Sequence, residues 1–206
     1  MIFDRRSLLG ATCALMAAGA AIAQTAPGGA PASAAATVAS DADNTLFLDT
    51  KDGRVIIRLR PDLAPKHAAQ IKALAKRGFY DGVPFHRVID GFMAQTGDPT
   101  GTGGGKSDLP NIPAEFSKEP FRRGTVGMAR SSSPDSANAQ FFICFADASF
   151  LNGQYTVIGE VASGMDVVDK IKKGSKADNG AVKDPDKLVK MTVASDAKKD
   201  GKKDGK

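Results

Sequence analysis

The chain has 206 residues, of which 42% are hydrophobic and 25% are charged, and its formal net charge at pH 7 is +5. This length and composition suffice for one globular domain with a sizeable core. The positive charge is dispersed, because Asp and Glu are mixed with Lys and Arg and no basic block alternates with aromatic residues. The composition gives little support to nucleic-acid binding, so no nucleic-acid partner is expected.

The N-terminus has the pattern of an export signal. Arg5 and Arg6 precede an uncharged run from Ser7 to Ala23, and small residues precede Gln24, where a signal peptidase would cleave. The run falls short of the roughly 20 residues that span a bilayer comfortably. Residues 1–23 are therefore predicted to be a signal peptide cleaved near Ala23, which leaves no stable membrane insertion and places the protein in the periplasm. The paired arginines favour a twin-arginine signal, and an ordinary charged signal is the alternative.

Both flanks of the domain are predicted to be flexible. Residues 24–43 form a linker, because small residues and proline dominate it and cannot bury enough surface to offset the entropy of ordering. Residues 196–206 alternate Lys and Asp with glycines and are predicted to be a solvated, disordered tail. The single folded domain is therefore assigned to residues 44–195.

The two cysteines are not expected to form a disulfide. Cys13 lies in the signal core and would leave with it. Cys144 lies in the apolar run from Phe141 to Phe145, which predicts a buried thiol of the core rather than a nucleophile.

Eight short strands are predicted along the domain, each bounded by Gly, Pro, Asn or Asp. The first two are joined by a tight hairpin at Asp52-Gly53, because Asp-Gly supplies the positive backbone angles that such turns need. The expected strands are Leu46–Leu48, Val55–Leu59, Val83–Val88, Gly91–Thr96, Thr125–Met128, Phe141–Phe145, Thr156–Glu160 and Leu188–Ala194.

Two helices are predicted between these strands. The first opens at Asp62 and Pro65, repeats apolar residues on one face, and closes at Gly78, a residue type that ends helices readily. The second covers Met165–Lys172. This order of elements fits a β-barrel or a β-sandwich whose ends are covered by two helices.

Two blocks carry most of the functional information. Residues 85–98 read Phe-His-Arg-Val-Ile-Asp-Gly-Phe-Met-Ala-Gln-Thr-Gly-Asp, and residues 136–143 read Ser-Ala-Asn-Ala-Gln-Phe-Phe-Ile. They resemble the two halves of the active site of cyclophilins, which are peptidyl-prolyl cis/trans isomerases, and the resemblance spans Thr45 to Ala194. It implies a mainly β fold, namely a closed eight-stranded antiparallel β-barrel capped by two α-helices.

The resemblance assigns the catalytic positions to Arg87 and Gln95. A twisted amide returns a lone pair to the proline nitrogen, and a fixed arginine can stabilise that state without any proton transfer. Because this chemistry needs only a shaped apolar pocket and a fixed donor, no cofactor and no metal are expected. The resemblance places the substrate-binding positions at His86, Phe92, Met93, Ala129, Arg130, Gln140, Phe142, Phe150, Leu151 and Tyr155.

Four features depart from the family pattern. Phe150 stands where many members have tryptophan, Tyr155 replaces a common histidine, and Arg130 stands where asparagine is frequent. Residues 131–137 form a segment one residue longer than in better-known members. We therefore expect cyclosporin-like ligands to bind with weakened affinity, and we expect Arg130 to favour acidic residues near the substrate proline.

Three other motifs are rejected. Gly105-Lys106-Ser107 ends like a phosphate-binding loop, but Thr100 stands where the first glycine is needed and the following prolines prevent the required helix. His86, the serines 131–133 and Asp135 suggest a hydrolytic triad, yet no serine lies in a sharp nucleophile turn. Neither His86 nor His67 has cysteines or carboxylates at metal-ligand spacing.

The sequence thus predicts an exported, monomeric prolyl isomerase that acts on proline-containing, unfolded or flexible polypeptides in the bacterial periplasm. One alternative is a proline-directed chaperone or binding module without significant turnover. Another is an accessory subunit of an envelope complex. Arg87 favours the enzyme, because a pure binding module would not need this arginine.

Overall fold

The computed structural model describes residues 41–200. The predicted export signal, almost all of the predicted linker and the last six residues lie outside this range. None of the helices within it is long and apolar enough to cross a membrane.

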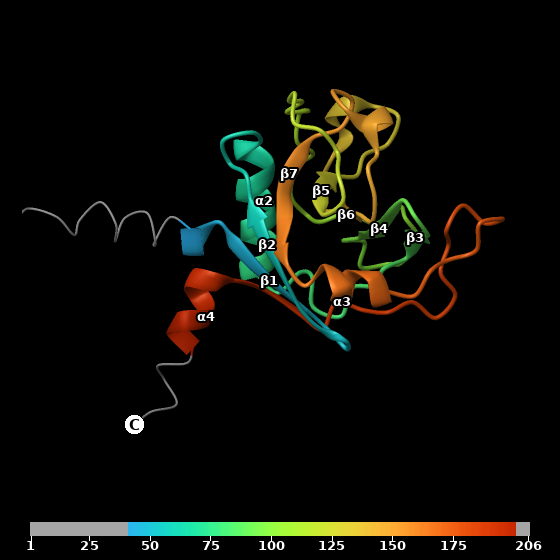
Figure 1. Cartoon of the computed structure of the whole chain (residues 1–206). Coiled ribbons are helices and arrows are strands. Elements are labelled where there is room, and N and C mark those ends of the chain that lie inside the picture. Colours follow the sequence, from blue (N-terminus) through green and yellow to red (C-terminus); the bar gives the residue numbers. More distant parts are fainter. Residues whose placement is uncertain (1–40, 201–206) are drawn as a thin grey trace, which may run out of the picture. The chain divides into compact units, whose positions relative to one another are not determined.

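One curled antiparallel sheet of eight strands dominates the described domain (Figure 1). Its strands follow the order β3-β4-β6-β5-β7-β2-β1-β8. All eight lie at or near the positions that the sequence predicts. Their bounds are β1 Thr45–Thr50, β2 Gly53–Leu59, β3 Arg87–Ile89, β4 Met93–Thr96, β5 Thr125–Met128, β6 Phe141–Cys144, β7 Val157–Ser163 and β8 Lys190–Val193.

The hairpin between β1 and β2 turns one residue earlier than expected. Thr50 pairs with Gly53, so Lys51 and Asp52 form the two-residue turn. Gly53 has a φ of 137° and begins strand β2. The Asp-Gly pair marks the hairpin correctly, but only its glycine adopts a positive φ.

The sheet is open, and the expected closed barrel is wrong in this respect. Within residues 41–200 no strand ladder joins β3 to β8. Isolated bridges pair Pro84 with Lys187 and Arg87 with Ala181 instead. Pro84 has no N–H to continue a ladder, and Asn179 takes a φ of 51°, which turns the chain out of a regular strand.

Besides the helical residues 41–43, three α-helices and two short 3-10 helices accompany the sheet. Helix α2 and helix α3 lie where two helices are predicted, whereas α4 occupies the start of the predicted solvated tail. Asp196 of α4 forms an ion pair with Lys76 of α2 at 3.4 Å, a tertiary contact that composition does not reveal. The bounds are α2 Pro65–Lys76, α3 Met165–Lys170, α4 Ala194–Asp200, η1 Pro134–Ser136 and η2 Ser149–Leu151.

Helix α2 is capped by a residue far away in the chain. Ala64 at its N-cap offers no side-chain acceptor. The Glu115 carboxylate accepts hydrogen bonds from the backbone N–H groups of Lys66 and His67 at 3.2 and 3.1 Å. It also accepts one from the His67 ring at 2.7 Å. Gly78 follows the helix with a φ of 68°, as the sequence predicts.

The central strands bury both of their faces. Along β6, Phe141 and Ile143 belong to the main hydrophobic core, which α2 also covers. The alternate residues Phe142 and Cys144 belong to a second hydrophobic cluster together with Met93 of β4. Because successive side chains of a strand point to opposite faces, this one run of residues separates the core from the site.

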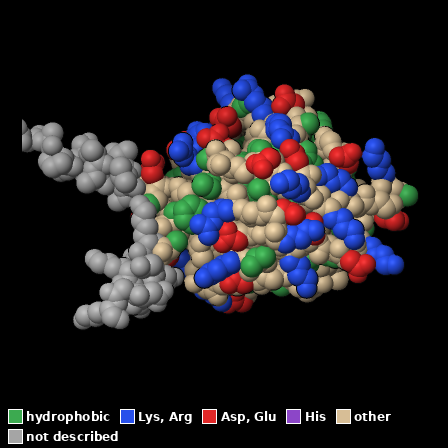
Figure 2. Space-filling view, turned by 60° about the horizontal axis from the view of Figure 1, so that its bottom comes forward, with side chains coloured by type: hydrophobic (Ala, Val, Ile, Leu, Met, Phe, Trp, Pro, Cys, Tyr) green, Lys and Arg blue, Asp and Glu red, His purple; other side chains and the backbone are tan. Residues whose placement is uncertain are grey.

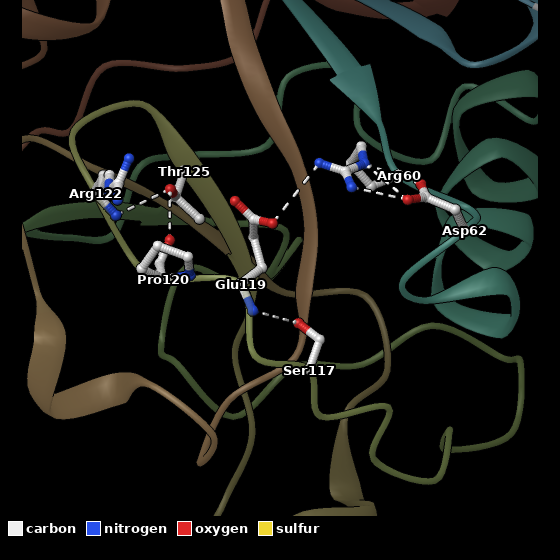
Figure 3. A network of polar contacts seen from close by, with 7 residues as sticks. All are labelled: Arg60, Asp62, Ser117, Glu119, Pro120, Arg122 and Thr125. Atoms are coloured by element: carbon white, nitrogen blue, oxygen red, sulfur yellow. Dashed lines mark hydrogen bonds and ion pairs between the residues drawn. The ribbon is translucent and has the colours of Figure 1, made fainter. Parts of the chain in front are cut away.

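A polar network anchors the segment that leads into β5 (Figure 3). Arg60 pairs with Asp62 at 2.8 Å and reaches Glu119 at 4.0 Å. The Thr125 hydroxyl accepts a hydrogen bond from the Arg122 backbone N–H at 3.0 Å. Exposed ion pairs of this kind contribute little stability each, so the network chiefly sets the path of the chain.

Figure 2 shows basic and acidic side chains interspersed over one face of the molecule.

Candidate active site

Four residues lie in register across four neighbouring strands. Arg87 of β3 pairs with Gln95 of β4, Gln95 pairs with Phe142 of β6, and Phe142 pairs with Gly127 of β5. Side chains at paired positions share one face of a sheet. The register therefore brings together two polar residues and one aromatic residue from the two sequence blocks.

A directional chain of hydrogen bonds orients the polar side chains. Arg87 Nη1 donates to Gln95 Oε1 at 3.2 Å, and Gln95 Nε2 donates to Gln140 Oε1 at 2.9 Å. Gln140 Nε2 then donates to the carbonyl oxygens of Gly103 and Gly105 at 3.0 and 2.9 Å. Since a guanidinium only donates, it fixes which end of the Gln95 amide faces it, and that choice fixes Gln140 in turn.

Asn179 holds the same arginine from the opposite side, and the sequence analysis missed it. Arg87 Nε donates to the Asn179 backbone oxygen at 3.0 Å, and Nη2 donates to Asn179 Oδ1 at 2.9 Å. Asn179 adopts a left-handed conformation, which Asn tolerates better than most residues. The Asn179-Gly180 pair was a visible turn signal, but nothing local indicated that this turn lies against β3.

Arg87 carries a charge that no described carboxylate neutralises. Its three hydrogen bonds go to the amide oxygens of Gln95 and Asn179. Burial lowers the pKa of the guanidinium from its usual value, but an arginine remains protonated in a protein. Two of its five N–H donors are left without a partner among residues 41–200.

Beside Arg87 lies a cavity of about 360 Å³. The ring of Phe142 stacks on Phe121 with a centroid separation of 5.8 Å and meets Tyr155 edge-on at 6.0 Å. Gly127 leaves the space for this stack, because a Cβ there would lie 2.5 Å from the Phe142 ring. The lining residues are Arg87, Phe92, Met93, Gln95, Ala129, Arg130, Phe142, Phe150, Leu151, Gln154 and Tyr155.

Two contacts shape the rim of the cavity. Phe150 is 63% exposed and packs against Phe92 with ring centroids 5.2 Å apart. Arg130 lies over the Tyr155 ring at 4.4 Å. Both Phe150 and Tyr155 are departures from the family pattern, and both are on the surface that a ligand would contact.

Most of the sequence-predicted site residues line this one cavity, but His86 and Gln140 do not. Gln140 lines a neighbouring cavity and reaches Arg87 through Gln95. The structure places His86 in the interior, near Gly103, with neither ring nitrogen hydrogen-bonded to a described residue. Burial lowers its pKa, against an opposing effect of Asp98.

The glycine-rich loop after β4 is wound around the buried carboxylate of Asp98. That carboxylate accepts hydrogen bonds from the Thr100 N–H and hydroxyl at 2.7 Å each and from the Gly103 N–H at 2.6 Å. Burial by itself would raise the pKa of Asp98, but these donors together lower it to about 2. The loop thus presents the Gly103 and Gly105 carbonyls to Gln140 in a fixed position.

The remaining reactive groups are the thiol of Cys144 and any cluster of side chains that could hold a metal ion. Cys144 is unpaired and fully buried, as predicted, and burial raises the pKa of its thiol to about 12. Such a thiol is not a nucleophile at neutral pH. In the part of the chain that the structure describes, no three His, Cys, Asp or Glu side chains form a group that could hold a metal ion.

Taken together, the site offers an apolar cavity beside a fixed, charged hydrogen-bond donor. The sequence profile of the family described as cyclophilin type peptidyl-prolyl cis-trans isomerase/CLD matches residues 45–193. A protein of Brucella suis biovar 1 named probable peptidyl-prolyl cis-trans isomerase is 63% identical over 173 residues, covering 78% of this chain and 87% of that protein. A peptidyl-prolyl cis-trans isomerase of Helicobacter pylori is 40% identical over 130 residues, covering 62% of this chain and 79% of that protein.

Solved structures agree with the sequence matches. The crystal structure of cyclophilin AquaCyp293 from Hirschia baltica superposes with a TM-score of 0.67 at 30% identity and covers 76% of each chain. A cyclophilin-type isomerase of Cryptosporidium parvum, solved in the presence of the dipeptide Ala-Pro, gives a TM-score of 0.66 at 27% identity, covering 72% of this chain and 98% of that chain. The chain belongs to the cyclophilin family, and its activity is peptidyl-prolyl cis/trans isomerisation.

Proposed function

We propose that the cavity of about 360 Å³ receives the proline ring and that Arg87 stabilises the twisted peptide bond. The observation that carries this proposal is the fixed guanidinium at the cavity wall, which has donors to spare and no described carboxylate partner. Phe92, Met93, Phe142 and Leu151 supply the apolar surface that a compact ring requires. The Cryptosporidium parvum relative was solved in the presence of Ala-Pro, a ligand of this chemistry.

The proposed mechanism needs no covalent step. The barrier to rotation is about 18 to 20 kcal/mol because twisting removes amide resonance. In the twisted state the proline nitrogen regains a lone pair, so a preorganised donor near it binds this state more strongly than either planar isomer. Gln95 acts through Arg87, because it holds one of the guanidinium nitrogens in place.

Exchange NMR on an X-Pro peptide tests the proposal directly. The full chain, with and without its first 23 residues, should accelerate cis/trans interconversion of the peptide, which takes tens to hundreds of seconds without a catalyst. Binding of the peptide without acceleration would identify a proline-directed binding module instead. The addition of a chelator should leave the rate unchanged.

We further propose that the protein is exported and assists the folding of proline-containing polypeptides in the periplasm. The support is the pattern of residues 1–23, which lie outside the described residues. Replacing Arg5 and Arg6 by Lys should leave the precursor in the cytoplasm if the signal is of the twin-arginine type. Efficient export of that variant in a fractionation experiment would indicate the general secretion route.

Cyclosporin-like ligands are proposed to bind more weakly than to relatives with a tryptophan at the rim. Phe150 has no indole N–H, so the binding free energy lacks the contribution of one hydrogen bond, about 0.5 to 1.5 kcal/mol. Phe150→Trp should tighten cyclosporin binding in a titration. An unchanged affinity would instead point to Tyr155 or Arg130, which also line the cavity.

A further inference from the structure

A second cavity of about 260 Å³ adjoins the proposed proline pocket. Gln95, Ala129 and Arg130 line both cavities, so a single layer of side chains forms their boundary. Glycines 103–105 form one wall and leave room because they carry no side chains. Because the two cavities share a wall and an extended peptide rises about 3.3 Å per residue, a peptide whose proline occupies the first cavity can place a side chain from within about three residues in the second.

The uncharged polar side chains of the second cavity already have partners within the protein. Gln95 and Gln140 are engaged in the chain of hydrogen bonds that begins at Arg87. Asn138 accepts from the Ser107 N–H and hydroxyl and donates to the Leu109 carbonyl oxygen at 2.8 Å. None of these amides has to wait for a substrate to satisfy its donors and acceptors.

Two cations differ from these amides. Lys106 lines the cavity, is exposed, and makes no hydrogen bond or ion pair with any residue of the range 41–200. Arg130 donates only to backbone carbonyl oxygens, those of Ser131, Ser132 and Gln154 at 2.9, 3.4 and 3.0 Å. These contacts hold the guanidinium in place without neutralising its charge.

Among residues 41–200, no carboxylate lines either cavity. Of the nearby acids, Asp98 is buried within its loop and Asp135 accepts the Ala114 N–H at 2.8 Å, and neither carboxylate is part of the cavity lining. Four other arginines of the described domain differ from Arg130 in this respect. Arginines 54, 60, 77 and 123 each pair with an aspartate.

We propose that the second cavity selects substrates that carry an Asp or Glu side chain within about three residues of the proline, with Lys106 and Arg130 as the recognising cations. The inference rests on the proposed function of the neighbouring proline pocket. Charges arranged in this way select partners and raise the association rate. Arg130 has a second role at the boundary, because it also packs on Tyr155 of the first cavity.

The test compares peptides that differ only in one residue near a single proline. Glu, Gln and Lys are placed in turn at each of the three positions before and after the proline, and kcat/KM for isomerisation is measured by exchange NMR. At the position that reaches the cavity, we expect Glu to exceed Gln by about 3- to 10-fold and Lys to fall below Gln. The preference should shrink when the salt concentration rises from about 0.05 to 0.5 M.

Charge variants identify the residues that are responsible. Lys106→Gln should reduce the preference for Glu, and Lys106→Glu should shift it toward Lys. Lys106 is exposed and forms no hydrogen bond or ion pair with a described residue, so its replacement should not affect folding. The Lys106 variants therefore decide the test even if a second variant, Arg130→Gln, disturbs the Tyr155 ring. Arg122→Gln is the matched control, because Arg122 is exposed and lines neither cavity.

The outcomes separate this inference from the proposed function. Acceleration of every peptide with equal kcat/KM for Glu and Gln at all positions overturns the acidic preference and leaves the isomerase intact. A preference that persists in Lys106→Glu also overturns it. Failure to accelerate any peptide overturns the proposed role of the pocket itself.

Discussion

At the scale of single residues, the site depends on how Arg87 is held. Three amide oxygens, one from Gln95 and two from Asn179, fix all three nitrogens of the guanidinium. Neutral acceptors orient the group without cancelling its charge. A carboxylate in the same place would hold the arginine equally well but would weaken its attraction for a developing lone pair.

Removing the guanidinium should slow turnover far more than it weakens binding. By analogy with the loss of one preorganised donor, Arg87→Ala should lose about 100- to 1000-fold in kcat. Arg87→Lys should recover little of the lost activity, because an ammonium group cannot reproduce the planar set of N–H donors of the guanidinium. Line-shape NMR on an X-Pro peptide gives binding and interconversion separately. Equal losses of both in a folded variant would make Arg87 a substrate clamp.

The side chain of Asn179 should matter through the orientation of Arg87. Asn179→Gly keeps the left-handed backbone and the carbonyl acceptor and removes only the bond to Oδ1. We expect kcat to fall by about 2- to 10-fold, the value of one hydrogen bond, with a smaller change in KM. Asp184→Gly is the matched control, since Asp184 has a φ of 52° in the same segment. An equal loss in the control would show that chain flexibility, not the amide, is responsible.

At the scale of elements, strand register assembles the site. Residues 87, 95, 142 and 127 come from β3, β4, β6 and β5, and only the antiparallel pairing of these strands aligns them. A shift of one residue in β6 would exchange Phe142 with a core residue such as Phe141. The same pairing that buries the main core therefore sets the site.

Gly127 links this register to the shape of the cavity. In Gly127→Ala the new methyl would lie 2.5 Å from Phe142 Cζ and 2.6 Å from Phe121 Cε1, so the Phe142 ring must move. We expect a loss of about 1 to 3 kcal/mol in the free energy of unfolding and a raised KM. Gly104→Ala, whose methyl would meet only Thr102 Oγ1 at 3.6 Å, is the control for stability. Recovery of stability in Gly127→Ala with Phe142→Leu would confirm the steric cause.

At the scale of the whole molecule, buried titratable groups couple the fold to pH. Burial lowers the pKa values of His67 and His86, against an opposing effect of Glu115 and Asp98 respectively. Burial alone would raise the pKa of Glu115, but its hydrogen bonds from His67 and from backbone N–H groups outweigh it and lower the pKa. Each of these groups therefore binds its proton more readily in the unfolded chain than in the fold.

The free energy of unfolding should consequently fall on acidification. The contribution of both histidines to the free energy of unfolding is complete above about pH 6.5, the pKa of histidine in the unfolded chain. It declines as the pH falls toward their lower pKa values in the folded state. Glu115 and Asp98 add a further decline below about pH 4. Urea unfolding between about pH 8 and pH 5 measures the histidine part, and His86→Phe should flatten the curve. A stability that rises over this range on acidification would contradict the prediction.

Local patterns of the sequence were sufficient for much of this protein. The apolar run that forms β6, the glycine that ends α2 and the two site blocks all depend on residues that are neighbours in the chain. Such features predicted the positions of the strands and of two helices, and the resemblance to the cyclophilin family supplied most of the residues that line the cavity. The turn at Lys51-Asp52 shows the usual precision of such reasoning, since the hairpin was correct and its register was off by one residue.

Tertiary structure decided the features that depend on distant residues. The sheet stays open because the segment before β8 meets β3 through isolated bridges, which no local pattern specifies. Glu115 caps a helix 48 residues away, and Asn179 orients an arginine 92 residues away. The sequence by itself thus determined which side chains are available and where the strands and two of the helices form. Only the folded chain decided which polar groups meet, because hydrogen bonds act over about 3 Å and residues this far apart come so close only when the chain folds.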